Sequence, residues 1–298
     1  MAAATQSSKE SQSVFKAEDV GLLLVYSEPG EKLSLEEFQD WYDNEHVPLR
    51  TKRFTTFRSA ARYKVAETFN PLNKVSDPTV INTSWGAFYA ISSNALFEDP
   101  AYTSLRTERS PREAGIFARL GALDRRSYKL VYDSHQDGRI HNPPKSAEES
   151  LKPETKEEVE RFSNHIVAHS VSVQDEEEYG KWFDEEHALM LSKCPGWTRT
   201  RRYILIDASV VGLKAAKDGK DVNEIPKILG LHEYANQDYI DSKEYKAAID
   251  TPWRTKVLGP NGEKVLQRER KVQNLYRAWD PEVALREYEV KMKGKDKI

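Results

Sequence analysis

Two Glu-His pairs are the side chains best suited to proton-transfer chemistry in this sequence. Glu45-His46 and Glu186-His187 each end a six-residue motif, Trp-Tyr-Asp-Asn-Glu-His in one place and Trp-Phe-Asp-Glu-Glu-His 141 residues later. Burial raises the pKa of a carboxyl group and imidazole titrates near neutral pH, so each pair is a candidate acid and base. In the structural alternative, each glutamate caps its helix or pairs with an arginine-bearing strand.

Further histidines in the second half are candidates for the same site. His169 lies in an alternating strand pattern, and His232 and Tyr234 share one face of a later strand. If these faces point toward the interior of the fold, His169, His187 and His232 converge with Tyr203 or Tyr234 on one pocket. There His187 would be the main general acid and base, oriented by Glu186. His169, His232 and Tyr203 would polarise a substrate carbonyl, and Tyr234 would contact the substrate. Each histidine taken singly has the alternative role of a hydrogen-bonded strand residue.

The first half lacks these extra histidines. When the two halves are aligned, Tyr26 stands opposite His169 and Phe88 stands opposite His232. We therefore expect the first half mainly to complete the wall of the pocket, with Tyr26 and Phe88 as substrate contacts.

Arginines on the strand after each motif are candidates to hold an anionic group. Arg62 and Arg202 occupy matching positions, each before a tyrosine. A guanidinium group makes charge-assisted bidentate hydrogen bonds with a carboxylate. Solvated strand-edge residues are the alternative. Trp41 and Trp182 are candidate platforms for an aromatic ligand, with core packing as their alternative role.

The sequence contains no recognisable metal or cofactor motif. Three converging histidines suit zinc or iron, but their spacing matches no local metal motif, so no metal is expected. The sequence contains no phosphate-binding glycine-rich loop, dinucleotide fingerprint, zincin motif or nucleophile elbow. We expect no organic cofactor.

A capped helix must carry each motif. Ser34 and Asp175 are predicted N-caps, because each is followed three residues later by a glutamate, and Leu33 can pack on Phe38. Pro48 is expected to end the first helix near His46.

Strands flank these helices in the order β-α-β-β-α-β, which occurs twice. This order predicts an α+β fold of two tandem ferredoxin-like repeats packed sheet to sheet. Eight strands can close into a barrel around side chains or one small ligand, so the arrangement predicts an interior cavity. Residues 66–83 and 207–227 are polar and are expected to form loops. The predicted domains are a disordered tail over 1–18, repeat 1 over 19–133, a linker over 134–160, repeat 2 over 161–280, and a helical, basic tail over 281–298.

Composition narrows the class of protein. The 298 residues carry a net charge of −3 without a basic stripe, which argues against nucleic acid as a partner. The single cysteine, Cys194, fits a reducing compartment, and no apolar run reaches the ~18 residues of a membrane span. We expect a cytoplasmic monomer (a pseudo-dimer) or homodimer whose partner is a small apolar or aromatic metabolite.

The motifs resemble those of a known family. A strand and capped helix ending in Trp-Tyr/Phe-Asp-x-Glu-His, then Pro195-Gly196-Trp197 and Arg202-Tyr203, are similar to EthD-like members of the dimeric α+β barrel superfamily. The resemblance covers residues 20–132 and 162–279. It implies that His46 or His187 faces a cavity mouth. The first half departs from the pattern, with Thr55-Thr56-Phe57 in place of Pro-Gly-Trp.

The resemblance also implies a range of activities. The family includes cofactor-free lyases, cyclases, decarboxylases, isomerases and monooxygenases, together with haem-handling branches. Our first expectation is a cofactor-independent enzyme that decarboxylates, dehydrates, cyclises or isomerises a small aromatic or polyketide-like acid by acid/base chemistry. The alternatives are a non-catalytic small-molecule binding protein, a cofactor-free monooxygenase and a haem-handling protein.

Overall fold

Eight antiparallel strands form a closed barrel in the computed structural model, which describes residues 13–69, 82–140, 162–215 and 225–279. Around the barrel the order is β1-β3-β2-β8-β5-β7-β6-β4. The strands are β1 (Gly21–Glu28), β2 (Phe57–Phe69), β3 (Trp85–Ile91), β4 (Ala122–Asp133), β5 (His165–Val173), β6 (Trp197–Val211), β7 (Ile228–Tyr234) and β8 (Val265–Trp279).

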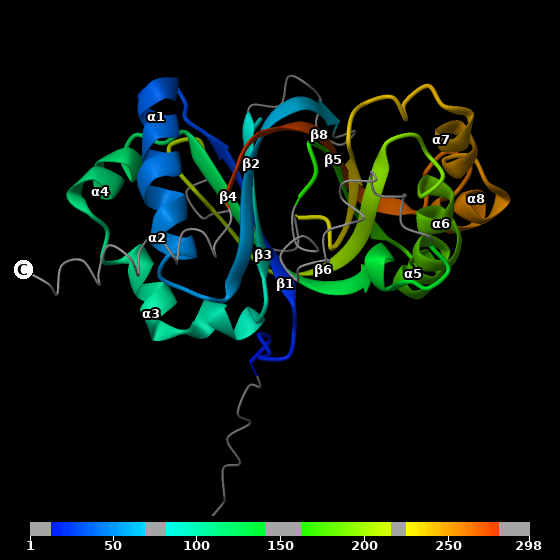
Figure 1. Cartoon of the computed structure of the whole chain (residues 1–298), viewed down its shortest axis with the longest axis horizontal. Coiled ribbons are helices and arrows are strands. Elements are labelled where there is room, and N and C mark those ends of the chain that lie inside the picture. Colours follow the sequence, from blue (N-terminus) through cyan, green and yellow to red (C-terminus); the bar gives the residue numbers. More distant parts are fainter. Residues whose placement is uncertain (1–12, 70–81, 141–161, 216–224, 280–298) are drawn as a thin grey trace, which may run out of the picture.

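Short helices cover the outside of the barrel in two groups. Figure 1 shows α1 to α4 on one side of the barrel and α5 to α8 on the opposite side. The helices are α1 (Leu35–Trp41), α2 (Val47–Thr51), α3 (Pro100–Thr103), α4 (Pro111–Phe117), α5 (Glu176–Trp182), α6 (Ala188–Leu191), α7 (Lys243–Ala248) and α8 (Pro252–Leu258). The fold is thus α+β, with the same order of strands and main helices in each half. A common origin of the halves stays a prediction.

Two seams between the halves close the barrel. β2 pairs with β8 as far as Phe69, and β4 pairs with β6 as far as Val211. The expected loops at 66–83 and 207–227 therefore begin as strands, and their parts at 70–81 and 216–224 lie outside the described residues. Their polar sequence misled the prediction, because the strand ends are exposed and their backbone groups are satisfied by the partner strand.

The inside of the barrel is packed with side chains. One buried apolar cluster joins strands of both halves and includes no helix residue, so it lies within the barrel. Beside it, Arg126 pairs with Asp124 at 2.8 Å and with Glu269 at 3.0 Å. The expectation of a ligand-sized hollow at this place is wrong, because aromatic and paired charged side chains occupy the space. The aromatic members of the cluster are Tyr26, Tyr63, Phe88, Tyr128, Phe162 and Tyr203.

The helix that carries each motif begins at its predicted cap. Ser34 Oγ accepts the N–H of Glu37 at 3.2 Å, and Asp175 Oδ1 accepts the N–H of Glu178 at 3.0 Å. The motif itself then widens the helix into a single π-helical turn, Tyr42–His46 in the first half and Phe183–His187 in the second. Such turns are frequent at functional sites.

Pro48 does not end the first helix, contrary to the prediction. It lies within α2, and His46 and Val47 keep right-handed helical backbone angles. The π-helical turn precedes the proline and shifts the hydrogen-bond ladder, so the missing N–H of Pro48 falls in the first turn of a new helical segment, where it costs little.

Parts of the predicted tail and linker contact the barrel domain. The Phe15 ring lies 5.5 Å from that of Phe97, and Ile140 is buried in the cluster that includes Trp197. The remainder of the predicted tails and linker, at 1–12, 141–161 and 280–298, lies outside the described residues. Within the described part of the chain, no helix has the length and apolarity needed to cross a membrane.

Candidate functional site

Two cavities lie between the helices and the outer face of the barrel, one in each half. The second-half cavity has a volume of about 210 Å³ and the first-half cavity about 110 Å³. The second-half cavity is defined here by His169, His187, His232, Arg254, Arg268 and Arg270. The first-half cavity is defined by His46, Arg50, Arg106, Arg109, Glu113 and Arg125.

His187 enters the second-half cavity from the end of the π-helical turn. Its ring stacks on Trp182 with 4.5 Å between centroids. Its Nδ1 lies 3.2 Å from the carbonyl oxygen of Ala248, which can only accept a hydrogen bond. Nδ1 therefore carries the hydrogen, and Nε2 is left as an acceptor. Burial lowers the pKa of His187 to about 4, so the ring is neutral at pH 7.

His232 lies beside His187 with the opposite hydrogen-bonding role. The two ring centroids are 5.5 Å apart. Trp197 Nε1 donates to Thr200 Oγ1 at 3.0 Å, and that hydroxyl lies 3.3 Å from Nδ1 of His232. The described residues offer the Thr200 hydroxyl no other acceptor, so we assign its hydrogen to the Nδ1 contact. His232 then carries its own hydrogen on Nε2, and burial holds its pKa well below the ordinary value.

His169, on β5, is the third histidine of the second-half cavity. It is half-buried and has no hydrogen bond to any described residue. Burial, helped by the nearby guanidinium group of Arg268, lowers the pKa of His169 to about 3. His169 is therefore a neutral imidazole that is free to donate to or accept from a ligand.

Arginines give the second-half cavity a positive charge. Arg270 lies 3.3 Å from Glu67, whereas Arg254 and Arg268 form no ion pair with a described carboxylate. Burial and the charge of Arg254 both lower the pKa of Arg268. Its Nε is buried without a hydrogen-bond partner. A carboxylate on a ligand would supply the acceptor that this wall lacks.

The two motif glutamates lie outside both cavities. Glu186 accepts hydrogen bonds from Trp182 Nε1 at 3.0 Å and from Thr251 Oγ1 at 2.5 Å. Glu45 accepts one from Ser110 Oγ at 2.5 Å. Ser110 and Thr251 are the N-caps of α4 and α8, so each glutamate ties the motif helix to the next helix pair. This position favours the structural alternative over catalysis.

The two strand arginines also bind within the protein. Arg62 donates to Asp43 at 2.5 Å, and Arg202 forms a bidentate pair with Asp184. Neither lines a cavity. Trp41 is fully buried, and its ring packs 4.6 Å from that of His46, whereas its counterpart Trp182 lines the second-half cavity.

Tyr26, Phe88 and Tyr203 point into the barrel, away from both cavities, whereas Tyr234 lines the second-half cavity. The alignment that placed Tyr26 opposite His169 and Phe88 opposite His232 was wrong by one residue. A shift of one residue moves a strand side chain to the other face of the sheet.

Strand pairing shows the matching positions. His169 pairs with Gly230, and Val25 pairs with Ala87, on the faces that carry the cavities. Val25 therefore corresponds to His169, and Tyr89 corresponds to His232. Both Val25 and Tyr89 line the first-half cavity.

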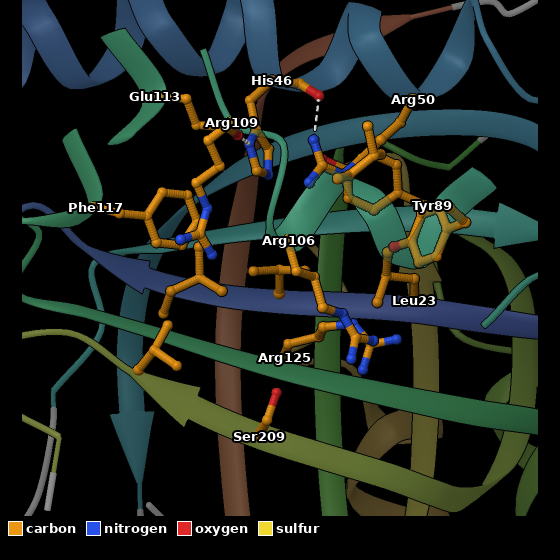
Figure 2. Close-up of a pocket in the computed structure, with 15 residues that line it drawn as sticks. Leu23, His46, Arg50, Tyr89, Arg106, Arg109, Glu113, Phe117, Arg125 and Ser209 are labelled. Carbon is orange, nitrogen blue, oxygen red and sulfur yellow. Dashed lines mark hydrogen bonds and ion pairs between the residues drawn. The ribbon is translucent and has the colours of Figure 1, made fainter. Parts of the chain in front are cut away.

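His46 in the first-half cavity is held by a carboxylate. Its Nδ1 lies 2.7 Å from Glu113 Oε1, and Arg50 Nη1 donates to the His46 carbonyl oxygen at 2.7 Å (Figure 2). Burial lowers the pKa of His46 to about 3. Although burial raises the pKa of Glu113, the hydrogen bond from His46 brings it below the ordinary value, so Glu113 is ionised.

Sequence reasoning missed most of the charged lining. Arg268 and Arg270 alternate along one strand, a signal that was present in the sequence. Arg254 and Glu113 come from α8 and α4, where no motif marks them. Although three histidines reach the second-half cavity, the described part of the chain holds no group of three or more His, Cys, Asp or Glu side chains arranged to bind a metal ion.

Comparisons with known proteins give distant structural likenesses. No protein-family model and no curated protein matches the chain. The solved structure of an anthrone oxidase-like protein has 9% sequence identity to this chain and a TM-score of 0.49. The match covers 89% of this chain and 94% of that protein. A protein from Fusobacterium nucleatum assigned as a monooxygenase is 10% identical. The match covers 88% of this chain and 95% of that protein, with a TM-score of 0.46. A second protein assigned as a monooxygenase, from Lactobacillus acidophilus, is 9% identical. The match covers 89% of this chain and 97% of that protein, with a TM-score of 0.44.

Proposed function

We propose that the protein is an EthD-like member of the dimeric α+β barrel superfamily that catalyses acid/base chemistry on a small aromatic or polyketide-like acid in the second-half cavity. The observation that carries this proposal is the contact between the imidazoles of His187 and His232, which we assign as acceptor and donor, beside two guanidinium groups that pair with no described carboxylate. A base, a hydrogen-bond donor and an anion site around one cavity are the parts that proton abstraction from a carbonyl compound needs.

Each group has a role in the proposed reaction. Arg254 and Arg268 hold the substrate carboxylate, and Trp182 offers a flat apolar wall to a ring. Nε2 of His187 takes a proton from the substrate carbon or hydroxyl. Nε2–H of His232 donates to the oxygen on which negative charge develops. His187 then returns the proton at the new position, which completes an isomerisation, or to a leaving hydroxyl, which completes a dehydration.

The bound anion adjusts the acidity of the histidines. In the empty cavity, burial and positive neighbours hold the pKa of His187 and His169 at about 4 and about 3. A carboxylate bound by the arginines favours the protonated imidazole and so raises both pKa values toward neutrality. His187 becomes an effective base only when substrate is present.

The size of the cavity fits this class of substrate. An apolar cavity of about 150 Å³ is known to hold benzene. The second-half cavity, at about 210 Å³, has room for one substituted ring. Its volume favours a compact phenolic or short polyketide acid over a large polycyclic one.

A non-catalytic binding protein is the second candidate. The low pKa of all three histidines is the observation that favours it, because a base with a pKa near 4 removes protons slowly. Tight binding of an aromatic acid without turnover would select this function.

Screening for turnover tests the proposal. The protein is incubated with a panel of hydroxybenzoates and short polyketide acids, and mass spectrometry detects lost water, lost CO2 or isomerised product. His187→Gln and His232→Gln are expected to bind the substrate and to lose turnover, while Arg112→Ala, a surface control, keeps it. Full turnover by both histidine variants would overturn the assignment. Oxygen consumption or a Soret band would select the monooxygenase or the haem-handling alternative.

A further inference from the structure

The first-half cavity has more positive charge than the protein neutralises. Its walls carry the guanidinium groups of Arg50, Arg106, Arg109 and Arg125. Figure 2 shows Arg109 and Arg50 on either side of His46, with Arg106 and Arg125 together farther from it. Against these four charges stand two carboxylates, Glu113 in the cavity and Asp207, which pairs with Arg125 at 2.8 Å. Because His46 is neutral, two positive charges remain. A dianion would balance them.

Arg125 shows where an acceptor is missing. Its side chain is 11% exposed, and one nitrogen, Nη1, donates to Asp207. Its Nε and Nη2 are buried and have no hydrogen-bond partner. Buried donors of a charged group are costly to leave unpaired, so a shift of the Arg125 guanidinium toward an anion in the cavity would give these two N–H groups the acceptors that they lack.

Arg106 and Arg109 stand at the exposed mouth of the cavity. The guanidinium group of Arg109 lies 4.1 Å from the centre of the Phe117 ring, which holds it over the opening. None of Arg50, Arg106 and Arg109 forms an ion pair with a carboxylate in the described parts of the chain. These residues can close around an anion that enters from solvent.

His46 adds a requirement for a proton on the anion. Glu113 is ionised and can only accept, so Nδ1 of His46 carries the hydrogen and Nε2 has a free lone pair. An anion that carries a hydroxyl group donates to that lone pair directly, whereas a bare oxyanion repels it unless His46 also takes up a proton, which burial disfavours by lowering the His46 pKa to about 3. Hydrogen phosphate has two negative charges and one P–OH. Sulfate has the same charge and shape but no hydroxyl group.

We propose that the first-half cavity is a second ligand site, separate from the cavity proposed for catalysis, and that it binds hydrogen phosphate. Arg125 donates two hydrogen bonds to the phosphate oxygens, Arg50, Arg106 and Arg109 surround the ion, and the P–OH donates to Nε2 of His46. The site takes no part in the proton transfer proposed for the second half. It discriminates phosphate from sulfate through a single hydrogen bond.

Titration calorimetry with inorganic phosphate and with sulfate, at pH 7 and constant ionic strength, tests the proposal. One saturable phosphate site is expected, with sulfate at least about 10-fold weaker, the value of one charged hydrogen bond. The double variant Arg106→Ala/Arg109→Ala alters exposed side chains, keeps the fold and is expected to weaken phosphate binding by about 10-fold or more. Arg112→Ala is the matched control, because Arg112 binds Asp40 outside the cavity.

Further variants separate this proposal from the catalytic one. His46→Phe is expected to remove the preference for phosphate, and circular dichroism confirms that it folds. His187→Gln is expected to bind phosphate like the parent protein. Equal affinity for sulfate and phosphate, or unchanged phosphate binding by Arg106→Ala/Arg109→Ala, would overturn the inference. Neither result bears on turnover in the second half.

Discussion

The two cavities occupy the same place in their halves and differ in what lines them. Each receives a histidine from the end of a π-helical turn, and each has an arginine on the last strand of its half, Arg125 or Arg270. The last helix of each half, α4 or α8, also reaches the cavity. Its third residue is Glu113 in α4 and Arg254 in α8. One helix position therefore decides whether the central histidine has an anionic partner or a cationic neighbour.

Different partners impose the same tautomer on the central histidines. Glu113 holds Nδ1–H of His46, and the carbonyl oxygen of Ala248 holds Nδ1–H of His187. Both rings therefore present Nε2 as an acceptor. The difference lies around them, because His187 lies beside a second imidazole, that of His232, whereas His46 has Tyr89 in the corresponding position and four arginines in its cavity. An acceptor beside a donor suits proton transfer, whereas an acceptor among arginines suits recognition of a protonated anion.

The largest effect is expected from removing the carboxylate that distinguishes the first-half cavity. Glu113→Ala removes the carboxylate beside the cavity arginines and leaves the buried His46 Nδ1–H without its acceptor. We expect the free energy of unfolding to fall by about 3 kcal/mol, the upper end of the cost of removing a charged acceptor from a buried donor. Urea denaturation at pH 7 measures this loss, with the exposed Glu108→Ala as control. A loss below about 1 kcal/mol would mean that Glu113 does not hold the cavity together.

Acid should destabilise the protein through His187. The unfolded chain binds a proton near pH 6.5, whereas the folded protein does so only near the His187 pKa of about 4. The contribution is therefore complete above pH 6.5 and is lost as the pH falls to 4, by about 3 kcal/mol. His187→Gln is expected to flatten the dependence of unfolding free energy on pH in this window. Parallel curves for the variant and the parent would contradict the buried neutral histidine.

The arginines of the second-half cavity should govern affinity and leave the chemistry largely intact. Arg268→Ala removes a charged hydrogen bond to the substrate carboxylate, so KM should rise by about 10- to 100-fold with kcat changed much less. The same substitution at Arg125 should leave KM unchanged. Steady-state kinetics on the acid found by screening measures both. An equal rise in KM for the two variants would show that the cavities do not act separately.

The sequence predicts the order of elements, the helix caps and the meeting of three histidines, but not the side of the barrel on which they meet. The alternation of side chains along a strand shows that His232 and Tyr234 share a face of the sheet. It does not show whether that face is the inside or the outside of the barrel. Apolar patterning usually settles that question, but β3 and β7 are buried on both faces, so every position is compatible with burial. The one-residue error at Tyr26 and Phe88 has the same cause.

Contacts between residues far apart in the chain could not be predicted from the sequence either. Glu113 reaches His46 across 67 residues, and no local motif marks that contact. Arg268 and Arg270 alternate along β8, but they line a cavity only together with α8, which contributes Arg254 and Leu258. Residues that act through a covering helix are found only once the layers are known.

The smallest effect is expected at Tyr203, the sequence candidate that the structure places inside the barrel. Its ring packs 6.4 Å from that of Tyr128, and burial, more than the opposing charge of Arg201, raises the pKa of Tyr203 to about 12. Tyr203→Phe keeps the packing and removes a hydroxyl that reaches neither cavity, so kcat and KM should change by less than about 2-fold. A 100-fold loss of kcat with normal stability would place the chemistry inside the barrel, and the comparison of two outer cavities would lose its basis.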